Sequence, residues 1–94
     1  MRVQYGALPY RFTPGAALEI LLVTSRESKR WIIPKGWPIK GLRPAKSAAR
    51  EAFEEAGVSG RIGMKSIGLF TYDKILDDGC IGCEVQVFPL LVKQ

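Results

Sequence analysis

Residues 36–58, which read GWPIKGLRPAKSAAREAFEEAGV, decide what this chain folds into. Glycines and prolines interrupt residues 35–44 too often for a regular element, so this part is predicted to be a loop. A helix follows from about Pro44 to Ala56, with Gly57 where a left-handed C-terminal cap is expected. Its apolar positions recur with a helical period and are mostly alanines, which favours close packing against a sheet.

Three glutamates share one side of this predicted helix. Glu51, Glu54 and Glu55 stand at i, i+3 and i+4, within side-chain reach of one another. A solvated acidic face is one interpretation of such a charge run. The other is a site for Mg²⁺ or Mn²⁺, because clustered oxygen ligands suit these ions and the upstream loop offers groups for phosphate oxygens.

The same stretch resembles the Nudix box, whose pattern is G-x5-E-x7-R-E-U-x-E-E-x-G-U with U an aliphatic residue. The residues in register are Gly36, Arg50, Glu51, Ala52, Glu54, Glu55, Gly57 and Val58. The flanking segments RWIIPKG (residues 30–36) and AGVSG (residues 56–60) look like the branch that hydrolyses diphosphoinositol polyphosphates and diadenosine polyphosphates.

The resemblance implies a single Nudix hydrolase domain over residues 1–94, with the box at 36–58. Its expected fold class is α+β, an α/β/α sandwich with a central mixed β-sheet. Carried over from the family, Glu51, Glu54 and Glu55 would bind Mg²⁺ or Mn²⁺, Glu51 as ligand or base. Arg50 would orient Glu51, and a main-chain carbonyl near Lys35 or Gly36 would complete the coordination.

Two features depart from the family pattern. Leu42 occupies the position of the first glutamate of the box, a residue used mainly to brace it. The chain also stops at Leu91-Val92-Lys93-Gln94 while still reading as strand, whereas family members continue through another strand and a C-terminal helix. A C-terminal truncation is therefore compatible with the sequence.

Composition excludes several other classes. With 94 residues the chain holds one domain, and 47% hydrophobic with 24% charged residues is typical of a folded globular protein. The longest unbroken apolar run, residues 20–23, is far shorter than the roughly 20 residues of a membrane span, and no secretory signal is recognisable, so the expected compartment is the cytoplasm. Without histidine, the chain cannot supply a Ser-His-Asp triad, a Cys-His pair or an H-E-x-x-H site.

Cys80 and Cys83 form a C-x-x-C spacing among strand-forming residues. A redox pair of this spacing normally opens a helix, and a structural zinc site needs further Cys or His ligands, so two small residues in a hairpin is the favoured interpretation.

Around the box, alternation and turn residues predict strands. The predicted elements are an irregular first strand over residues 2–12, a buried strand over 17–24, a surface turn over 25–30, a short strand over 31–33, β character over 61–75, a hairpin turn at 77–79 and a closing strand over 83–92.

Further residues are candidates for contact with substrate or metal. Lys35, Lys40 and Arg43 could hold phosphates, although solvated loop charge is the alternative. Trp31 and Tyr72 could stack on a nucleobase, although an aromatic among apolar neighbours is more often core. The candidates for an additional acidic ligand are Asp73, Asp77, Asp78 and Glu84.

The predicted function is Mg²⁺-dependent hydrolysis of a phosphoanhydride bond in a nucleoside diphosphate-linked or polyphosphorylated small molecule, with diadenosine polyphosphates or diphosphoinositol polyphosphates favoured. The net charge of +5 suits such a polyanion. A non-catalytic nucleotide- or RNA-binding module on the same scaffold is the first alternative, and an acidic-faced structural helix is the second. No membrane or nucleic-acid partner is expected, and a second copy of the chain is a candidate partner.

Overall fold

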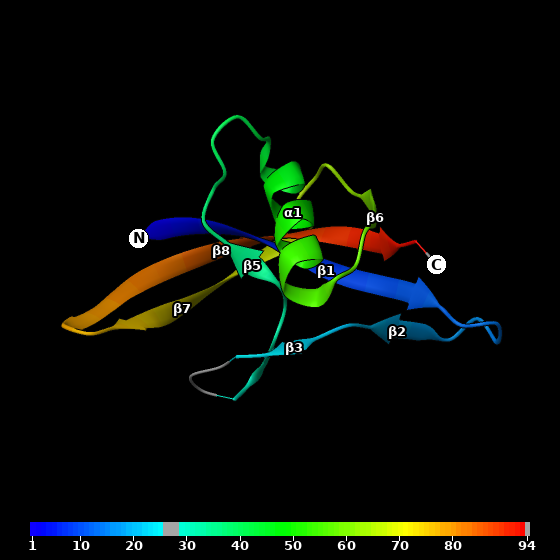
Figure 1. The fold of residues 1–94 in the computed structure, drawn as a ribbon, viewed down its shortest axis with the longest axis horizontal. Helices are drawn as coiled ribbons and strands as arrows, with labels where there is room; N and C mark the ends of the chain where they lie inside the picture. Colours follow the sequence, from blue (N-terminus) through cyan, green and yellow to red (C-terminus); the bar gives the residue numbers. More distant parts are fainter. Residues whose placement is uncertain (26–28, 94) are drawn as a thin grey trace.

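Two long parallel strands form the centre of the molecule (Figure 1). The structure is a computed structural model and describes residues 1–25 and 29–93. β1 (Arg2–Phe12) and β8 (Gly79–Val92) pair from Arg2 opposite Cys83 to Tyr10 opposite Leu91. The first and last strands of the chain are therefore neighbours in the middle of one mixed sheet.

Shorter strands extend this sheet on both sides. β2 (Leu18–Ile20) and β5 (Lys35–Gly36) pair with β1, and β6 (Gly60–Ile62) and β7 (Gly68–Leu76) pair with β8, all antiparallel. β3 (Val23–Thr24) and β4 (Trp31–Ile32) form a separate antiparallel pair. The predicted turn at 77–79 joins β7 to β8, which confirms the closing hairpin.

Helix α1 (Pro44–Ala56) lies across one face of the sheet (Figure 1). Its buried alanines, Ala45, Ala48 and Ala52, pack against Ala7, Phe88 and Leu90. The helix ends at Gly57, whose φ of 68° is the left-handed cap conformation expected from the sequence. Helix and cap are confirmed as predicted.

Buried Ser47 ties the preceding loop to α1. The Ile39 backbone N–H donates to the Ser47 hydroxyl at 3.1 Å, between residues eight positions apart. Because the loop is held to the helix here, the stretch that leads from β5 into α1 has a fixed course.

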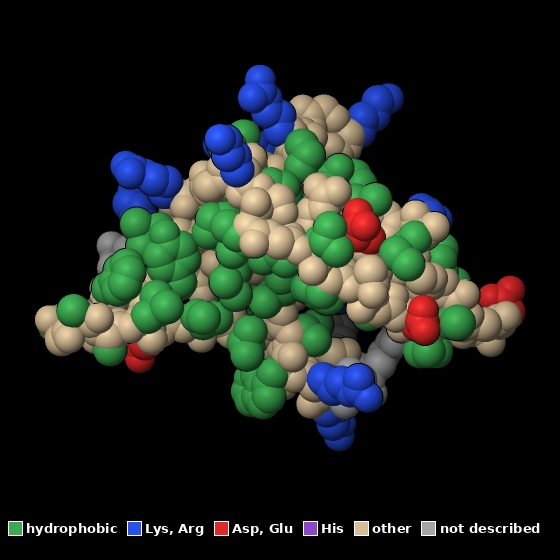
Figure 2. All heavy atoms as spheres, turned by 180° about the vertical axis from the view of Figure 1, so that it is seen from behind, with side chains coloured by type: hydrophobic (Ala, Val, Ile, Leu, Met, Phe, Trp, Pro, Cys, Tyr) green, Lys and Arg blue, Asp and Glu red, His purple; other side chains and the backbone are tan. Residues whose placement is uncertain are grey.

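The α+β fold class and its mixed central sheet are confirmed. α1 is the single helix of the described residues. These residues therefore do not include the second helical layer expected on the face of the sheet opposite α1. Figure 2 shows hydrophobic side chains spread over that opposite face. Among the described residues no helix is long and apolar enough to cross a membrane.

The predicted buried strand over residues 17–24 is wrong. The structure divides it into β2 and β3, which belong to different sheets, and Leu18 and Ile20 are half exposed. An apolar run becomes buried only where a second layer covers it, and β2 lies at the sheet edge beside the exposed ion pair of Arg11 with Glu19 (2.7 Å).

The first strand is regular rather than irregular. The Pro9 carbonyl accepts a hydrogen bond from the Leu21 N–H at 3.0 Å, on the side of β1 away from β8. The Pro9 nitrogen points to the same side, so its missing N–H leaves the ladder with β8 intact. Gly6 permits close packing, since a Cβ there would lie 2.9 Å from Ile33 Cδ1. Lys35–Gly36, predicted as loop, pairs with Gly6 and Tyr5.

The predicted surface turn over residues 25–30 lies partly outside the described residues. Within the described part, the Ser25 N–H donates to the Arg30 carbonyl at 2.9 Å and closes the connection between β3 and β4.

Candidate functional site

The site begins where α1 crosses β5. Glu51 on the helix packs against Gly36 so closely that a Cβ at Gly36 would lie 2.4 Å from the Glu51 carboxyl carbon and 2.5 Å from Oε1. No side chain other than hydrogen leaves room for this carboxyl group. The glycine and the glutamate that the motif analysis selected therefore meet in space.

Glu55, one helical turn further on, lies beside Glu51. Burial, a hydrogen bond with Glu55, and repulsion from Glu55 and Glu54 together raise the pKa of Glu51 to about 7. A proton on Glu51 removes one negative charge from this crowded part of the helix. A bound cation would relieve the same repulsion.

The third glutamate has a weaker link to Glu51. Glu54 is exposed, as Glu55 is, and it acts on Glu51 through its charge alone. Over residues 1–25 and 29–93, no three acidic, histidine or cysteine side chains lie close enough together to hold a metal ion as they stand. The structure thus brings Glu51 and Glu55 together, with Glu54 at the margin.

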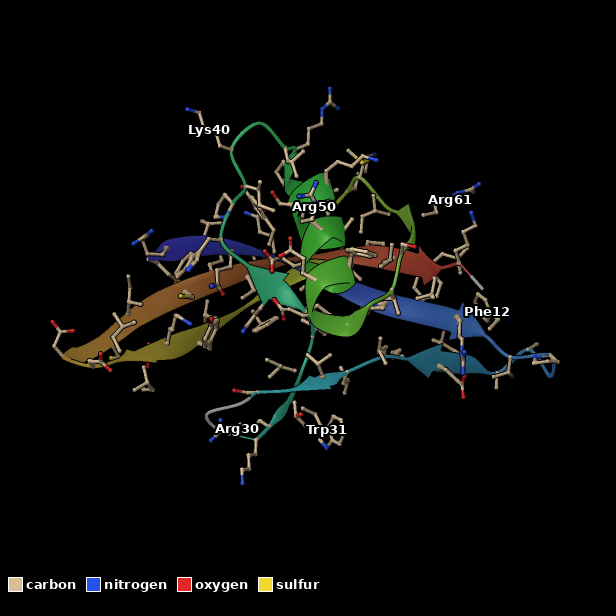
Figure 3. The ribbon with its side chains drawn as sticks, in the orientation of Figure 1. Phe12, Arg30, Trp31, Lys40, Arg50 and Arg61 are labelled. Atoms are coloured by element: carbon tan, nitrogen blue, oxygen red, sulfur yellow. The ribbon has the colours of Figure 1, made fainter. Side chains whose placement is uncertain are left out.

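Arg50 is exposed on α1, where Figure 3 labels it, and it forms no ion pair with any described carboxylate. Its role in orienting Glu51 stays a prediction.

Lys35 and Tyr72 both lie within electrostatic reach of Glu55. The Lys35 Nζ is 4.6 Å from the centroid of the Tyr72 ring, and the Tyr72 hydroxyl donates to Gln4 Oε1 at 2.7 Å. Burial lowers the pKa of Lys35, and the nearby charge of Glu55 opposes that effect. Burial also raises the pKa of Tyr72 to about 12, so its hydroxyl keeps its proton.

A hollow of about 790 Å³ opens beside this lysine. Three cationic side chains reach it, and apolar and aromatic side chains form much of its wall. Its lining residues are Ser25, Arg30, Ile32, Lys35, Phe70, Tyr72, Asp73, Lys74 and Ile75. This combination suits phosphate groups attached to a partly apolar body.

Other predicted contact residues lie elsewhere. Lys40 is exposed at the tip of the loop before α1, and Trp31 is 71% exposed at the far end of the molecule (Figure 3). Arg43 lines a separate hollow of about 280 Å³ with Met64 and Phe88. Neither Lys40, Arg43 nor Trp31 belongs to the hollow beside Lys35.

The four acidic candidates also separate. Asp73 lines the hollow, whereas Asp77 and Asp78 form the turn between β7 and β8. Glu84 lies opposite Thr71 and therefore on the other face of the sheet from Tyr72. Asp73 is the acidic candidate on the lining of the hollow, but by alternation its side chain points to the same face as that of Glu84 and away from Tyr72.

The residues of this site that escaped the sequence prediction include Gln4, Arg30, Phe70 and Lys74. Alternation along β7 places Phe70, Tyr72 and Lys74 on one face, which is a signal the sequence did carry. Gln4 carried none, since its proximity to Tyr72 requires the pairing of β1, β8 and β7.

Known proteins resemble the chain in sequence over different lengths. No family model matches it. It is 36% identical over 98 residues to Nudix hydrolase 21, chloroplastic, of Arabidopsis thaliana, covering 95% of this chain and 45% of that protein. It is 45% identical over 53 residues to diphosphoinositol polyphosphate phosphohydrolase 2 of Rattus norvegicus, covering 55% of this chain and 29% of that one. The chain thus spans less than half the length of these curated relatives.

Solved structures share the fold. The Ap4A hydrolase of C. elegans superimposes with a TM-score of 0.64 at 22% identity, covering 97% of this chain and 69% of that chain. The NUDIX domain of Shewanella oneidensis NrtR, solved with ADP ribose, gives a TM-score of 0.71 at 14% identity, covering 100% and 62%. With its box sequence, its mixed sheet crossed by α1, and these relatives, the chain belongs to the Nudix family.

Proposed function

We propose that this protein hydrolyses a phosphoanhydride bond in a polyphosphorylated or nucleoside diphosphate-linked small molecule. The observation that carries the proposal is the Glu51 carboxyl group, packed on Gly36 and interacting with Glu55, whose charge in turn acts on Lys35 of the cationic hollow. Diadenosine polyphosphates and diphosphoinositol polyphosphates are the favoured substrates, in line with the names of the relatives.

A divalent cation, Mg²⁺ or Mn²⁺, fits the donors present. Glu51 and Glu55 offer hard oxygen ligands, and their mutual repulsion is what a bound cation would relieve. Glu54 and the main-chain carbonyl of Gly36 would complete the set. When bound, the ion neutralises phosphate oxygens and lowers the pKa of a coordinated water.

Glu51 is the proposed base. In the metal-free protein its pKa is raised to about 7, so Glu51 holds a proton more tightly than an ordinary glutamate does. The absence of a Cβ at Gly36 leaves the space that this carboxyl group occupies close to the strand.

Lys35, Lys74 and Arg30 are proposed to bind the phosphate oxygens. All three line one hollow, which Asp73 leaves with a net positive charge. Lys40, Arg43 and Trp31 would be reached only by substrate that extends beyond this hollow.

The test is a hydrolysis screen over dinucleoside polyphosphates, nucleotide sugars and inositol pyrophosphates with Mg²⁺. Turnover of one class is expected, and Glu51→Gln should lower kcat by about 10²- to 10⁴-fold. Glu19→Gln, in the exposed ion pair at the sheet edge, is the matched control. No turnover across the panel would refute the proposal.

A non-catalytic nucleotide- or RNA-binding module remains the second candidate. Leu42, in place of the first glutamate of the box, and the net charge of +5 favour it. Tight binding without turnover, unchanged in Glu51→Gln, would select this alternative. The cytoplasmic location and a homodimer stay predictions.

A further inference from the structure

Lys35, Gln4 and Tyr72 lie on one face of the sheet although they come from three different strands. In the β5–β1 ladder Lys35 lies opposite Gly6, two residues from Gln4, and in the β8–β7 ladder Tyr72 lies opposite Cys83. Cys83 is two residues from Val85, which is the partner of Gln4. Because side chains alternate between faces, all three point to the same side.

Gln4 is a fixed anchor for Tyr72. Its side chain is 3% exposed, and its Oε1 accepts the Tyr72 hydroxyl proton at 2.7 Å. A buried amide that pairs with a hydroxyl has little freedom to turn, because turning would leave a polar atom unsatisfied. The plane of the Tyr72 ring is therefore set from the centre of the sheet.

Tyr72 in turn holds the charge of Lys35. The Nζ stands 4.6 Å from the ring centroid, within the range of a cation–π contact. Lysine carries its charge on a flexible four-carbon stem, which needs a partner to stay in one place. Both residues line the same hollow as Lys74 and Phe70.

We infer that Tyr72, anchored by Gln4, is a positioning residue that holds the Lys35 ammonium in the hollow to bind phosphate oxygens of the substrate. The inference rests on the proposed function for its substrate class, a polyphosphate. Tyr72 acts through Lys35 and does not itself need to touch the reacting atoms. Loss of the ring should free the lysine and weaken phosphate binding.

The test is calorimetric binding of inorganic tripolyphosphate to the whole chain without divalent metal, at fixed ionic strength. Tyr72→Leu is expected to weaken binding by about three- to thirtyfold, while Tyr72→Phe, which keeps the ring, retains most of it. Tyr10→Leu is the matched control, since Tyr10 is a partly buried tyrosine outside the hollow.

A double-mutant cycle separates positioning from general damage. In a Lys35→Met background, Tyr72→Leu should cause no further loss of tripolyphosphate binding. Additive losses, or full binding by Tyr72→Leu, would overturn the inference. This binding cycle is independent of the hydrolysis screen. If the protein shows the coupling but no turnover in the screen, only the proposed function is refuted. If it shows turnover but no coupling, only the inference is refuted.

A measurement on the unmodified protein covers the case in which Tyr72→Leu does not fold. The protons of the Lys35 methylene group bonded to Nζ should show upfield ring-current shifts in NMR spectra, because this Nζ lies over the Tyr72 ring at 4.6 Å from its centroid. Unshifted methylene protons would also overturn the inference.

Discussion

At the scale of single residues, Gly36 and Glu51 form the contact that shapes the site. The carboxyl group fills the space that any Cβ at position 36 would occupy. Gly36 is therefore required because it has no side chain, whether or not its main-chain carbonyl binds a metal ion.

Gly36→Ala should displace Glu51 without unfolding the protein. A shift of about 1 Å in a catalytic group costs on the order of 10² in rate, and a loss of this size in kcat is expected. Gly15→Ala is the control, because a Cβ at Gly15 would meet nothing within 4 Å. Equal rates in the two variants would contradict the assigned role.

Glu51 also predicts how stability depends on pH. Its folded pKa of about 7 lies above the ordinary value of 4.5, so the folded protein binds more protons than the unfolded chain between these values. Without metal, the free energy of unfolding should thus fall as pH rises from about 4.5 to 7, by about 1 kcal/mol after allowing for solvent screening.

Glu51→Gln should remove this slope. At pH 8 the variant is expected to melt about 4–8 °C above the unmodified protein, and at pH 4 the two should melt together. Thermal melts in metal-free buffer measure this, with Glu19→Gln as control. Parallel pH profiles for the two proteins would disprove the raised pKa.

The sequence foretold part of this residue-scale arrangement. Helical spacing placed Glu51 and Glu55 together, and the motif added Gly36. The spacing could not rank Glu54 against Glu55, because that depends on the tilt of α1 over β5. The predicted role of Arg50 stays a prediction, since its side chain is exposed and has no ion-pair partner among the described carboxylates.

At the scale of elements, α1 holds the site by lying close to the sheet. Ala45, Ala48 and Ala52 let the helix approach the strands, which brings Glu51 down to β5. Larger side chains on this face would move the helix away from the sheet, and Glu51 and Glu55 would move with it.

Ala52→Leu should therefore lower both stability and activity. Overpacking of a filled core typically costs 1–3 kcal/mol, and urea denaturation should show about this loss. Phe53→Leu, at an exposed position on the same helix, should change stability by no more than about 0.5 kcal/mol. An equal effect of both substitutions would argue against close packing of α1.

Elements with strong local signals were predictable, and those decided by distant partners were not. The helix, its Gly57 cap and the 77–79 turn carry their own signals in neighbouring residues. Residues 17–24 have the apolar pattern of a buried strand, but no second layer covers them in the structure and their apolar side chains are largely exposed. The short strand at Lys35–Gly36 forms only because β1 offers a free edge.

At the scale of the whole molecule, the net charge of +5 favours encounter with a polyanion. KM for a polyphosphate substrate should rise by about an order of magnitude on going from low to high salt, as screening weakens that attraction. Lys74→Gln should raise KM and flatten the salt dependence, because Lys74 lines the hollow.

Lys65→Gln provides the matched control for charge. Lys65 is an exposed lysine outside the hollow, so its loss should leave KM at low salt nearly unchanged. Equal shifts for both variants would mean that overall charge, and not the hollow, attracts the substrate.

The pairing of β1 with β8 has a consequence for the order in which the molecule assembles. Residues 2–10 pair with residues 83–91, so synthesis must reach about residue 91 before the central ladder closes. Until then α1 has no complete surface on which to settle, since Phe88 and Leu90 belong to the late strand. Folding should consequently be slow for so small a domain, and a nascent chain released before residue 90 would carry the Nudix motif without its shape.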